Sequence, residues 1–162
     1  QRLKFVGLYA TDVHTREAYA SLTVGNRSVS EIAIKEIGIK NGGIAFDLTA
    51  LYRAKEGMDE RTRIVIEQRH SIDFSLSVEE LKGILVDGKK GKELKTLRLY
   101  ALDLMGNLYQ GKIGAVRKLL ADSMAGRTPA VSAPQAPADE GIAAASEPQE
   151  EPSGAEPQEP EE

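Results

Sequence analysis

Hydrophobic and polar residues alternate along much of the first 113 residues of the chain. Every second residue is apolar in "AYASLTV" (18–24) and again in "SIDFSLSV" (71–78), and "GIAF" (43–46) with Leu48 continues the pattern. Successive side chains of a β-strand point to opposite faces, so this period of two is typical of strands with one buried face. The pattern predicts an antiparallel sheet with one face against a core.

One segment breaks this alternation. In "EIAIKEIGI" (31–39), the first two of the four isoleucines occupy even positions and the last two occupy odd positions. A regular strand cannot place all four on one face, whereas one extra residue near Lys35-Glu36 restores the common face. We therefore expect a β-bulge there, or a strand that bends from one sheet to another.

The segment "LRLYALDLMGNLYQGKI" (97–113) predicts the hairpin that closes a sheet. Its first half is apolar on both faces, which is typical of a central or covered strand. Asp103, Gly106 and Asn107 then supply a turn, and "LYQGKI" returns as the last strand. With the turn-rich segments between the other apolar runs, the chain is expected to form about seven or eight short strands.

Two short helices are also expected. Ser77-Val78-Glu79-Glu80 fits a capping box, which predicts a helical turn through Leu81 to Ile84. "GAVRKLLADSMAG" (114–126) places three apolar residues on one helical face and ends in a glycine, as helices often do.

The last 35 residues differ in kind from the rest. All seven prolines lie from Pro129 onward, and residues 128–162 contain nine acidic and no basic residues. The formal net charge of −4 thus divides into +5 for residues 1–127 and −9 for the tail. The tail has too few large apolar residues to offset the entropy of ordering it, so we expect disorder. The expected organisation is a β-sandwich over 1–113, a short helix or connector over 114–127, and a disordered acidic tail over 128–162.

The composition excludes several classes of protein. There are no cysteines, which removes disulfides, thiolate-bound zinc and thiol catalysis. No run of about 18 apolar residues occurs, so no membrane span is expected in this stretch. Because the chain begins with Gln1 rather than Met, we expect a fragment or processed form, with an upstream segment that directs it to the cell envelope or surface.

The motifs that resemble catalytic sites are weak. "GILVDGKK" (83–90) matches the phosphate-loop spacing, but Lys90 stands where a magnesium-binding Ser or Thr is needed. His14 and His70, the two histidines, sit in separate polar connectors, and no close pair of metal ligands exists. We therefore expect no enzyme, no cofactor and no metal.

A set of basic residues is the candidate contact surface for an anion or a partner. Its members are Arg61, Arg63, Lys89, Lys90, Lys92 and Lys95. Phosphate contacts need Lys and Arg, so nucleic acid or an anionic membrane surface is a candidate partner. The charge division also suggests that the acidic tail folds back over this patch. Exposed charges are screened beyond about 8 Å at physiological salt, so that contact would be weak and sensitive to salt.

Three segments resemble bacterial and phage immunoglobulin-like accessory domains. They are "LTVGNRSVSEIAIKEIGI" (22–39), "IEQRHSIDFSLSVEEL" (66–81) and "LYALDLMGNLYQGKI" (99–113). The resemblance implies an immunoglobulin-like antiparallel β-sandwich with a binding or spacer role, and it implies no catalytic residues.

These observations predict an all-β, non-enzymatic binding or structural module. We expect it to belong to a larger or membrane-tethered bacterial or phage protein and to bind another protein, still unidentified, by strand addition to a sheet edge. The alternative is a basic-patch module for nucleic acid or an anionic surface. "NRS" (26–28) fits a glycosylation sequon but is interpreted as a turn.

Overall fold

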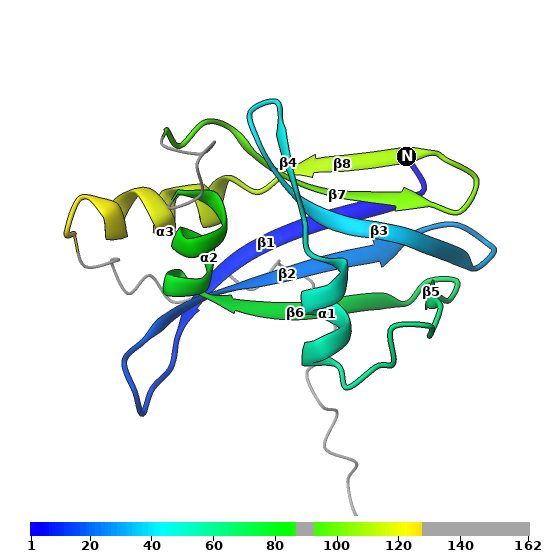
Figure 1. Ribbon diagram of the computed structural model, residues 1–162, viewed down its shortest axis with the longest axis horizontal. Helices are drawn as coiled ribbons and strands as arrows, with labels where there is room; N and C mark the ends of the chain where they lie inside the picture. Colours follow the sequence, from blue (N-terminus) through cyan, green and yellow to red (C-terminus); the bar gives the residue numbers. More distant parts are fainter. Residues whose placement is uncertain (87–92, 128–162) are drawn as a thin grey trace, which may run out of the picture.

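The computed structural model describes residues 1–86 and 93–127, and most of its regular structure is β (Figure 1). Strands hold 45% of the described residues and helices 21%. The strands form two antiparallel sheets, here called sheet A and sheet B, and three helices accompany them in this part of the chain. The predicted β-rich, antiparallel class is confirmed; the tail over 128–162 lies outside the described residues.

Sheet A has three strands in the order β1–β2–β6. The strands are β1 (Leu3–Thr11), β2 (Ala18–Asn26) and β6 (Ser71–Ser77). Leu22 and Val24 are fully buried, while Ser21 and Thr23 between them are partly exposed. The alternation predicted from the sequence therefore sets which face of this sheet meets the core.

Sheet B has the strand order β4–β3–β7–β8, and a short strand, β5, also pairs with β3. The strands are β3 (Ile32–Asn41), β4 (Ile44–Asp47), β5 (Ile64–Ile66), β7 (Leu97–Asp103) and β8 (Leu108–Lys112). The register of β3 against β7 shifts between Ile34 and Glu36, which confirms the predicted bulge. The bulge lets all four isoleucines of β3 be buried. The predictions that β7 is central and that β8 closes the sheet are also confirmed.

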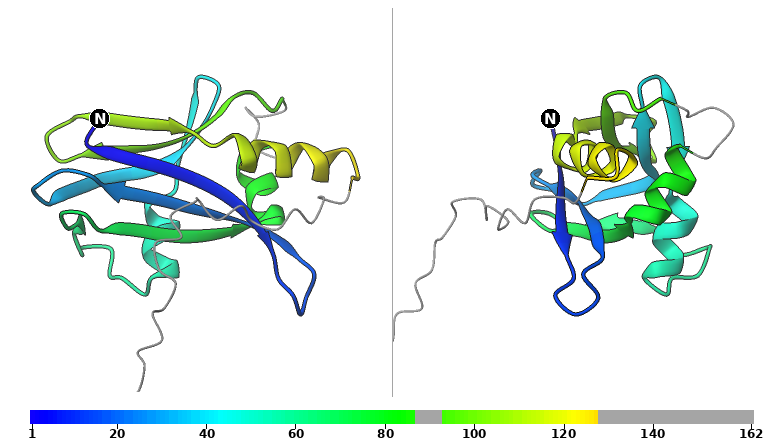
Figure 2. Two further views of the ribbon diagram at one scale, coloured as in Figure 1. Left: turned by 180° about the vertical axis from the view of Figure 1, so that it is seen from behind. Right: turned by 90° about the vertical axis from the view of Figure 1, so that its left-hand side faces the viewer.

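One hydrophobic core lies between the two sheets (Figures 1 and 2). Leu22 and Leu76 of sheet A and Ile37 and Leu99 of sheet B are all fully buried. The alternating strands present their apolar side to this core, whereas β7 also buries Tyr100 on its opposite face.

The strands β1 and β8 lie side by side where the two sheets meet (Figure 2). A Cβ atom at Gly7 would lie 2.7 Å from the Cβ of Ile113, and one at Gly111 would lie 2.7 Å from the Cβ of Phe5. Two glycines, one on each strand, thus allow the backbones to approach. This contact, here called the β1–β8 seam, closes one side of the core.

The three helices cover the open parts of the core. Helix α2 (Val78–Leu85) begins at the predicted capping box, in which Ser77 and Glu80 exchange hydrogen bonds. Helix α3 (Gly114–Met124) buries Val116, Leu119 and Leu120, as its pattern predicts. Because these side chains belong to the same core as the strands, α3 packs as part of the domain.

Helix α1 (Thr49–Lys55) was not expected from the sequence. It lies beside β6, where the ring of Tyr52 packs edge-on against Phe74 with 5.6 Å between the ring centroids. Lys55 makes an ion pair of 3.0 Å with Glu80 and so links α1 to α2. No helix in the described ranges is long and apolar enough to cross a membrane.

Candidate functional site

The three described members of the predicted basic patch, Arg61, Arg63 and Lys95, do not form one surface. Arg61 and Arg63 are exposed in the loop between α1 and β5, while Lys95 precedes β7. The loop joins β3 at Ile34, which pairs with Ile64, whereas Lys95 bonds to Asn41 at the other end of β3. Seven strand residues span about 23 Å, so the two groups are far apart. Lys89, Lys90 and Lys92 lie outside the described residues.

A different set of cations lies together on the outer face of sheet B. Lys40 of β3 is directly opposite Arg98 of β7, and Arg98 is directly opposite Lys112 of β8. We call these three residues the basic row. Adjacent strands are about 4.8 Å apart, so the row crosses three strands with its backbone positions spaced at that interval. The flanking residues Ile39 and Leu99 are fully buried, which places the row on the face away from the core.

No residue in the described ranges forms an ion pair with the basic row. The carboxylates of Glu36 and Asp47 act on its surroundings, where they add to burial in raising the pKa of Tyr100 beside Lys40. Like charges directly opposite each other on neighbouring strands destabilise a sheet. The arrangement therefore costs stability in the free protein, and a bound anion would offset that cost.

Tyr100 lies beside the row on the same face of sheet B, two residues after Arg98 on β7. Only 2% of its surface is exposed, and its hydroxyl donates a hydrogen bond of 2.5 Å to Oε1 of Glu36. Burial, together with the neighbouring carboxylate of Glu36, raises the pKa of Tyr100 well above its ordinary value, so the hydroxyl stays protonated and remains a donor. The Nζ of Lys40 lies 5.4 Å from the centroid of the Tyr100 ring. This cation–π contact holds the Lys40 ammonium over the sheet.

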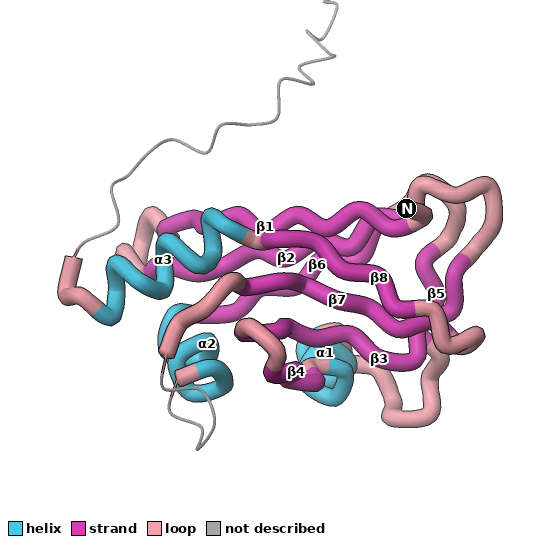
Figure 3. Tube along the Cα trace, turned by 90° about the horizontal axis from the view of Figure 1, so that it is seen from above, coloured by secondary structure: helices cyan, strands magenta, loops and turns pink. Residues whose placement is uncertain are grey.

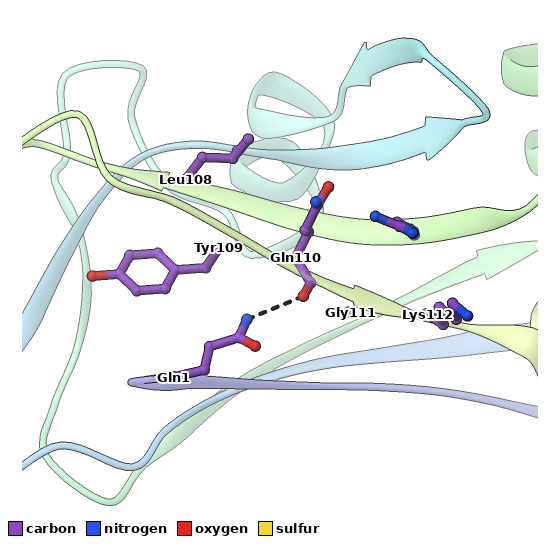
Figure 4. Close-up of a pocket in the computed structure, with 7 residues that line it drawn as sticks. Gln1, Leu108, Tyr109, Gln110, Gly111 and Lys112 are labelled. Atoms are coloured by element: carbon purple, nitrogen blue, oxygen red, sulfur yellow. Dashed lines mark hydrogen bonds between the residues drawn. The ribbon is translucent and has the colours of Figure 1, made fainter.

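A groove runs along β8 beside Arg98 (Figure 4). It is lined by Gln1, Arg98 and residues 108–112. The side-chain Nε2 of Gln1 donates a hydrogen bond of 3.0 Å to the main-chain oxygen of Gln110. Leu108 is 49% exposed at the end of the groove away from Lys112. The groove thus offers an apolar side chain and two basic ones to a ligand lying along the strand.

Lys95 lies two residues before β7, beside the end of β3 that carries Lys40, and is fixed there through its backbone. Its N–H donates to the side-chain oxygen of Asn41 at 2.7 Å, and its carbonyl accepts from Nε of Arg117 at 2.9 Å. Asn41 follows Lys40 directly, so Lys95 and Arg117 extend the positive charge from the row toward α3. Lys95 is thus the one described member of the predicted patch that lies near the row.

The edges of the sheets offer little free backbone to an added strand. The open edge of β8 faces β1 across the β1–β8 seam and binds Gln1 (Figure 3). Strand β4 has four residues, and α1 lies beside β6. These features favour a partner that contacts the face of sheet B rather than one that extends a sheet.

The remaining candidates for chemistry do not assemble into a site. His14 and His70 lie near opposite ends of β2, because His14 is in the β1–β2 turn and the carbonyl of His70 accepts from the N–H of Asn26. In the described part of the chain, no three His, Asp or Glu residues group as metal ligands. Of the sequence "GILVDGKK", Gly83–Leu85 form the end of α2, so a helix leads into the motif where a phosphate loop would follow a strand, and residues 87–90 lie outside the described residues.

Asn26 of the "NRS" sequence holds a turn, as the sequence predicts. Its side-chain amide donates to the carbonyls of Ser30 and Ile66 at 2.8 and 2.9 Å, and its oxygen accepts from the N–H and hydroxyl of Ser28. Asn26 is 3% exposed. The side chain is therefore a buried structural element, with both of its polar atoms bonded.

Comparisons with protein-family models, with curated proteins and with solved structures find no match of any kind. Function is therefore inferred from the geometry of the basic row. Sequence reasoning did not single out Lys40, Arg98 or Lys112. Each is a lone cation facing outward on an alternating strand, and only the strand order and register bring them together.

Proposed function

We propose that this chain is a non-enzymatic binding module whose basic row takes an acidic segment of a protein partner. The supporting observation is the placement of three cations in register across β3, β7 and β8 with no ion pair in the described residues. An extended acidic segment that crosses these strands would meet one cation per strand. Carboxylates pair well with both Arg and Lys, and the Arg98 guanidinium accommodates a carboxylate in bidentate geometry.

The face of sheet B fits an acidic peptide better than a nucleic acid. Proteins that bind single strands stack bases on exposed aromatic side chains. Tyr100 lies beside the row but is only 2% exposed, and the hydroxyl of Tyr109 donates to the buried carboxylate of Asp103. The exposed apolar residue at the groove is Leu108, which suits an aliphatic side chain of a peptide. The nucleic-acid alternative remains an outcome of the test below.

The wider proposal is an immunoglobulin-like sandwich that serves a larger or membrane-tethered bacterial or phage protein. In the described part of the chain, eight antiparallel strands in two sheets around one core support the sandwich part of this proposal. A binding role in such a protein would need a surface like the basic row, which forms no ion pair with any described residue.

The test measures the affinity of the full chain for two labelled probes, a short oligoglutamate peptide and a short oligothymidylate, by fluorescence anisotropy at low salt. The row variant carries Lys40→Gln, Arg98→Gln and Lys112→Gln. The control variant carries Lys4→Gln, Arg61→Gln and Arg63→Gln, which removes the same charge from exposed positions outside the row. Three exposed ion pairs of about 0.5 kcal/mol each predict about tenfold weaker peptide binding for the row variant.

We expect the control variant to change peptide affinity by less than about twofold. Equal losses in both variants would show that net charge rather than the row binds the peptide, and would contradict the proposal. Tighter binding of the oligothymidylate than of the oligoglutamate would favour the nucleic-acid alternative. Circular dichroism and thermal unfolding of each variant establish that it keeps its fold.

A further inference from the structure

The chain carries an acidic segment of its own, and we propose that this tail, residues 128–162, docks on the basic row and competes with the partner. The competition part of this inference rests on the proposed function, because the tail can compete only if the row binds a partner. The contact itself has separate evidence in the charge of the tail, its attachment point and the length of chain between the tail acids and the row.

The charges of the two surfaces are complementary. The tail contains nine acidic residues and no basic residue, and residues 1–127 have a formal charge of +5. The basic row places three cations in register and finds no ion-pair partner among the described residues. The same chain thus carries a cationic face without ion pairs among the described residues and a segment whose sequence is strongly acidic.

The tail is attached close enough to reach the row. Helix α3 begins two residues after Lys112, and its 11 residues extend about 16 Å. Arg127, the last described residue, therefore lies within about 30 Å of Lys112. Asp139 is the first acidic residue of the tail and follows Arg127 by a stretch of chain that spans at most about 40 Å. Every acidic residue of the tail has enough chain to reach the row.

Cations also lie near the start of α3 and beside the end of β3 that carries Lys40. Arg117 and Lys118 are exposed on α3, and Nε of Arg117 bonds to the carbonyl of Lys95. At the end of the helix, Arg127 already pairs with Asp122 at 3.3 Å. Hydrogen bonds place Arg117 next to Lys95, and Lys95 next to Asn41, the residue that follows Lys40.

Covalent attachment makes a weak contact effective. A tethered segment has an effective concentration in the millimolar range, so even weak ion pairs hold it on the row for much of the time. While the tail occupies the row, the apparent affinity for an external acidic ligand falls in proportion to the free fraction. The contact is exposed and is therefore lost at high salt.

The test compares three full-length chains. In the neutral-tail variant, every acidic residue of 128–162 is replaced, Glu by Gln and Asp by Asn. In the shuffled-tail variant, the same tail residues stand in a different order, so the charge is kept. The two readouts are the affinity for oligoglutamate and the amide NMR shifts of Lys40, Arg98 and Lys112.

We expect the neutral tail to raise oligoglutamate affinity by about threefold to tenfold at low salt, and to shift the amide signals of the row. The shuffled tail should behave like the natural one, because the attraction depends on charge. Both differences should disappear at about 1 M salt. The shifts should not depend on protein concentration, because the contact lies within one chain.

Several results would overturn the inference. Row amides that are the same with natural and neutral tails would show that the tail does not dock there, as would changes confined to Arg61 and Arg63. Shifts that depend on protein concentration would assign the contact to a second copy. If only the proposed function is wrong, the row amides will still respond to the tail, but the neutral-tail chain will not bind oligoglutamate.

Discussion

At the scale of single residues, Asp103 shows how a charged side chain serves structure in this protein. It is 6% exposed, and its carboxylate accepts hydrogen bonds from the N–H groups of Met105 and Asn107, the amide of Asn107 and the hydroxyl of Tyr109. Burial acts to raise the pKa of Asp103, but the hydrogen bonds from Asn107, Tyr109 and Met105 outweigh it and lower the pKa. The residue holds the β7–β8 turn in place.

Replacing this carboxylate should therefore weaken the fold. In Asp103→Asn, an amide NH₂ group would face donors that need an acceptor. We expect the free energy of unfolding to fall by about 2–3 kcal/mol, measured by chemical denaturation at neutral pH. The exposed carboxylate of Glu60 is the control, and Glu60→Gln should change stability by less than about 0.5 kcal/mol. Equal stability of Asp103→Asn and the natural chain would contradict this role.

The contribution of Asp103 to the stability of the fold should depend on pH. Because the pKa of Asp103 is lower in the folded chain than in the unfolded one, the unfolded chain binds the proton more tightly. The contribution of Asp103 is fully present above its unfolded pKa of about 3.9 and is lost as pH falls through the folded pKa. The stability difference between the natural chain and Asp103→Asn should then shrink below about pH 4. A difference that grows toward acid would contradict the assignment.

The position of Arg98 between two lysines predicts that its charge is repelled in the folded chain. It lies between Lys40 and Lys112, so Arg98→Gln removes two like-charge contacts. In a chain with the neutral tail, we expect Arg98→Gln to raise stability by about 0.5 kcal/mol at low salt, with the gain disappearing at about 1 M salt. The matched control Arg61→Gln lies outside the row and should leave stability unchanged. A loss of stability in Arg98→Gln at low salt would show that its charge is already balanced.

At the scale of elements, several features follow from local sequence. The bulge in β3 follows from the spacing of its isoleucines, and the start of α2 follows from Ser77 and Glu80. The central position of β7 follows from its two apolar faces. Each of these depends on residues close together in the chain, where periodicity and capping chemistry suffice.

Other features depend on contacts between distant segments. Helix α1 has seven residues and no side-chain hydrogen bond at its N-cap, so its sequence carries little helical signal. Its place is set by Tyr52 packing on Phe74 and by the ion pair of Lys55 with Glu80. The basic row likewise requires the register of β3, β7 and β8, which alternation within a single strand does not specify.

The β1–β8 seam gives a prediction at this scale. In Gly7→Ala or Gly111→Ala, the new Cβ would lie 2.7 Å from a neighbouring side chain, so we expect a loss of about 1–3 kcal/mol in stability. Gly83 is exposed in α2 and has nothing within 4 Å of a new Cβ, so Gly83→Ala should add about 0.5–1 kcal/mol. Thermal unfolding of the three variants checks the contrast. Equal effects at all three sites would mean that the seam does not restrict the strands.

At the scale of the whole molecule, the fold separates structural and binding roles by face. The inner faces of both sheets and the three helices enclose the core, while the outer face of sheet B carries the basic row. The sequence predicted a cationic surface and an acidic tail. The predicted surface included Arg61 and Arg63, which the fold places at the opposite end of β3 from Lys95. The net charge of residues 1–127 predicts a cationic surface, but the pairing register of β3, β7 and β8 determines which residues form it.

The most direct test of this account is an NMR titration of the full chain bearing the neutral tail with unlabelled oligoglutamate. If the outer face of sheet B is the binding surface, the largest amide shifts will fall at Lys40, Arg98 and Lys112 and will diminish as salt rises. The largest shifts at Arg61 and Arg63, or uniformly small shifts over the chain, would contradict the account.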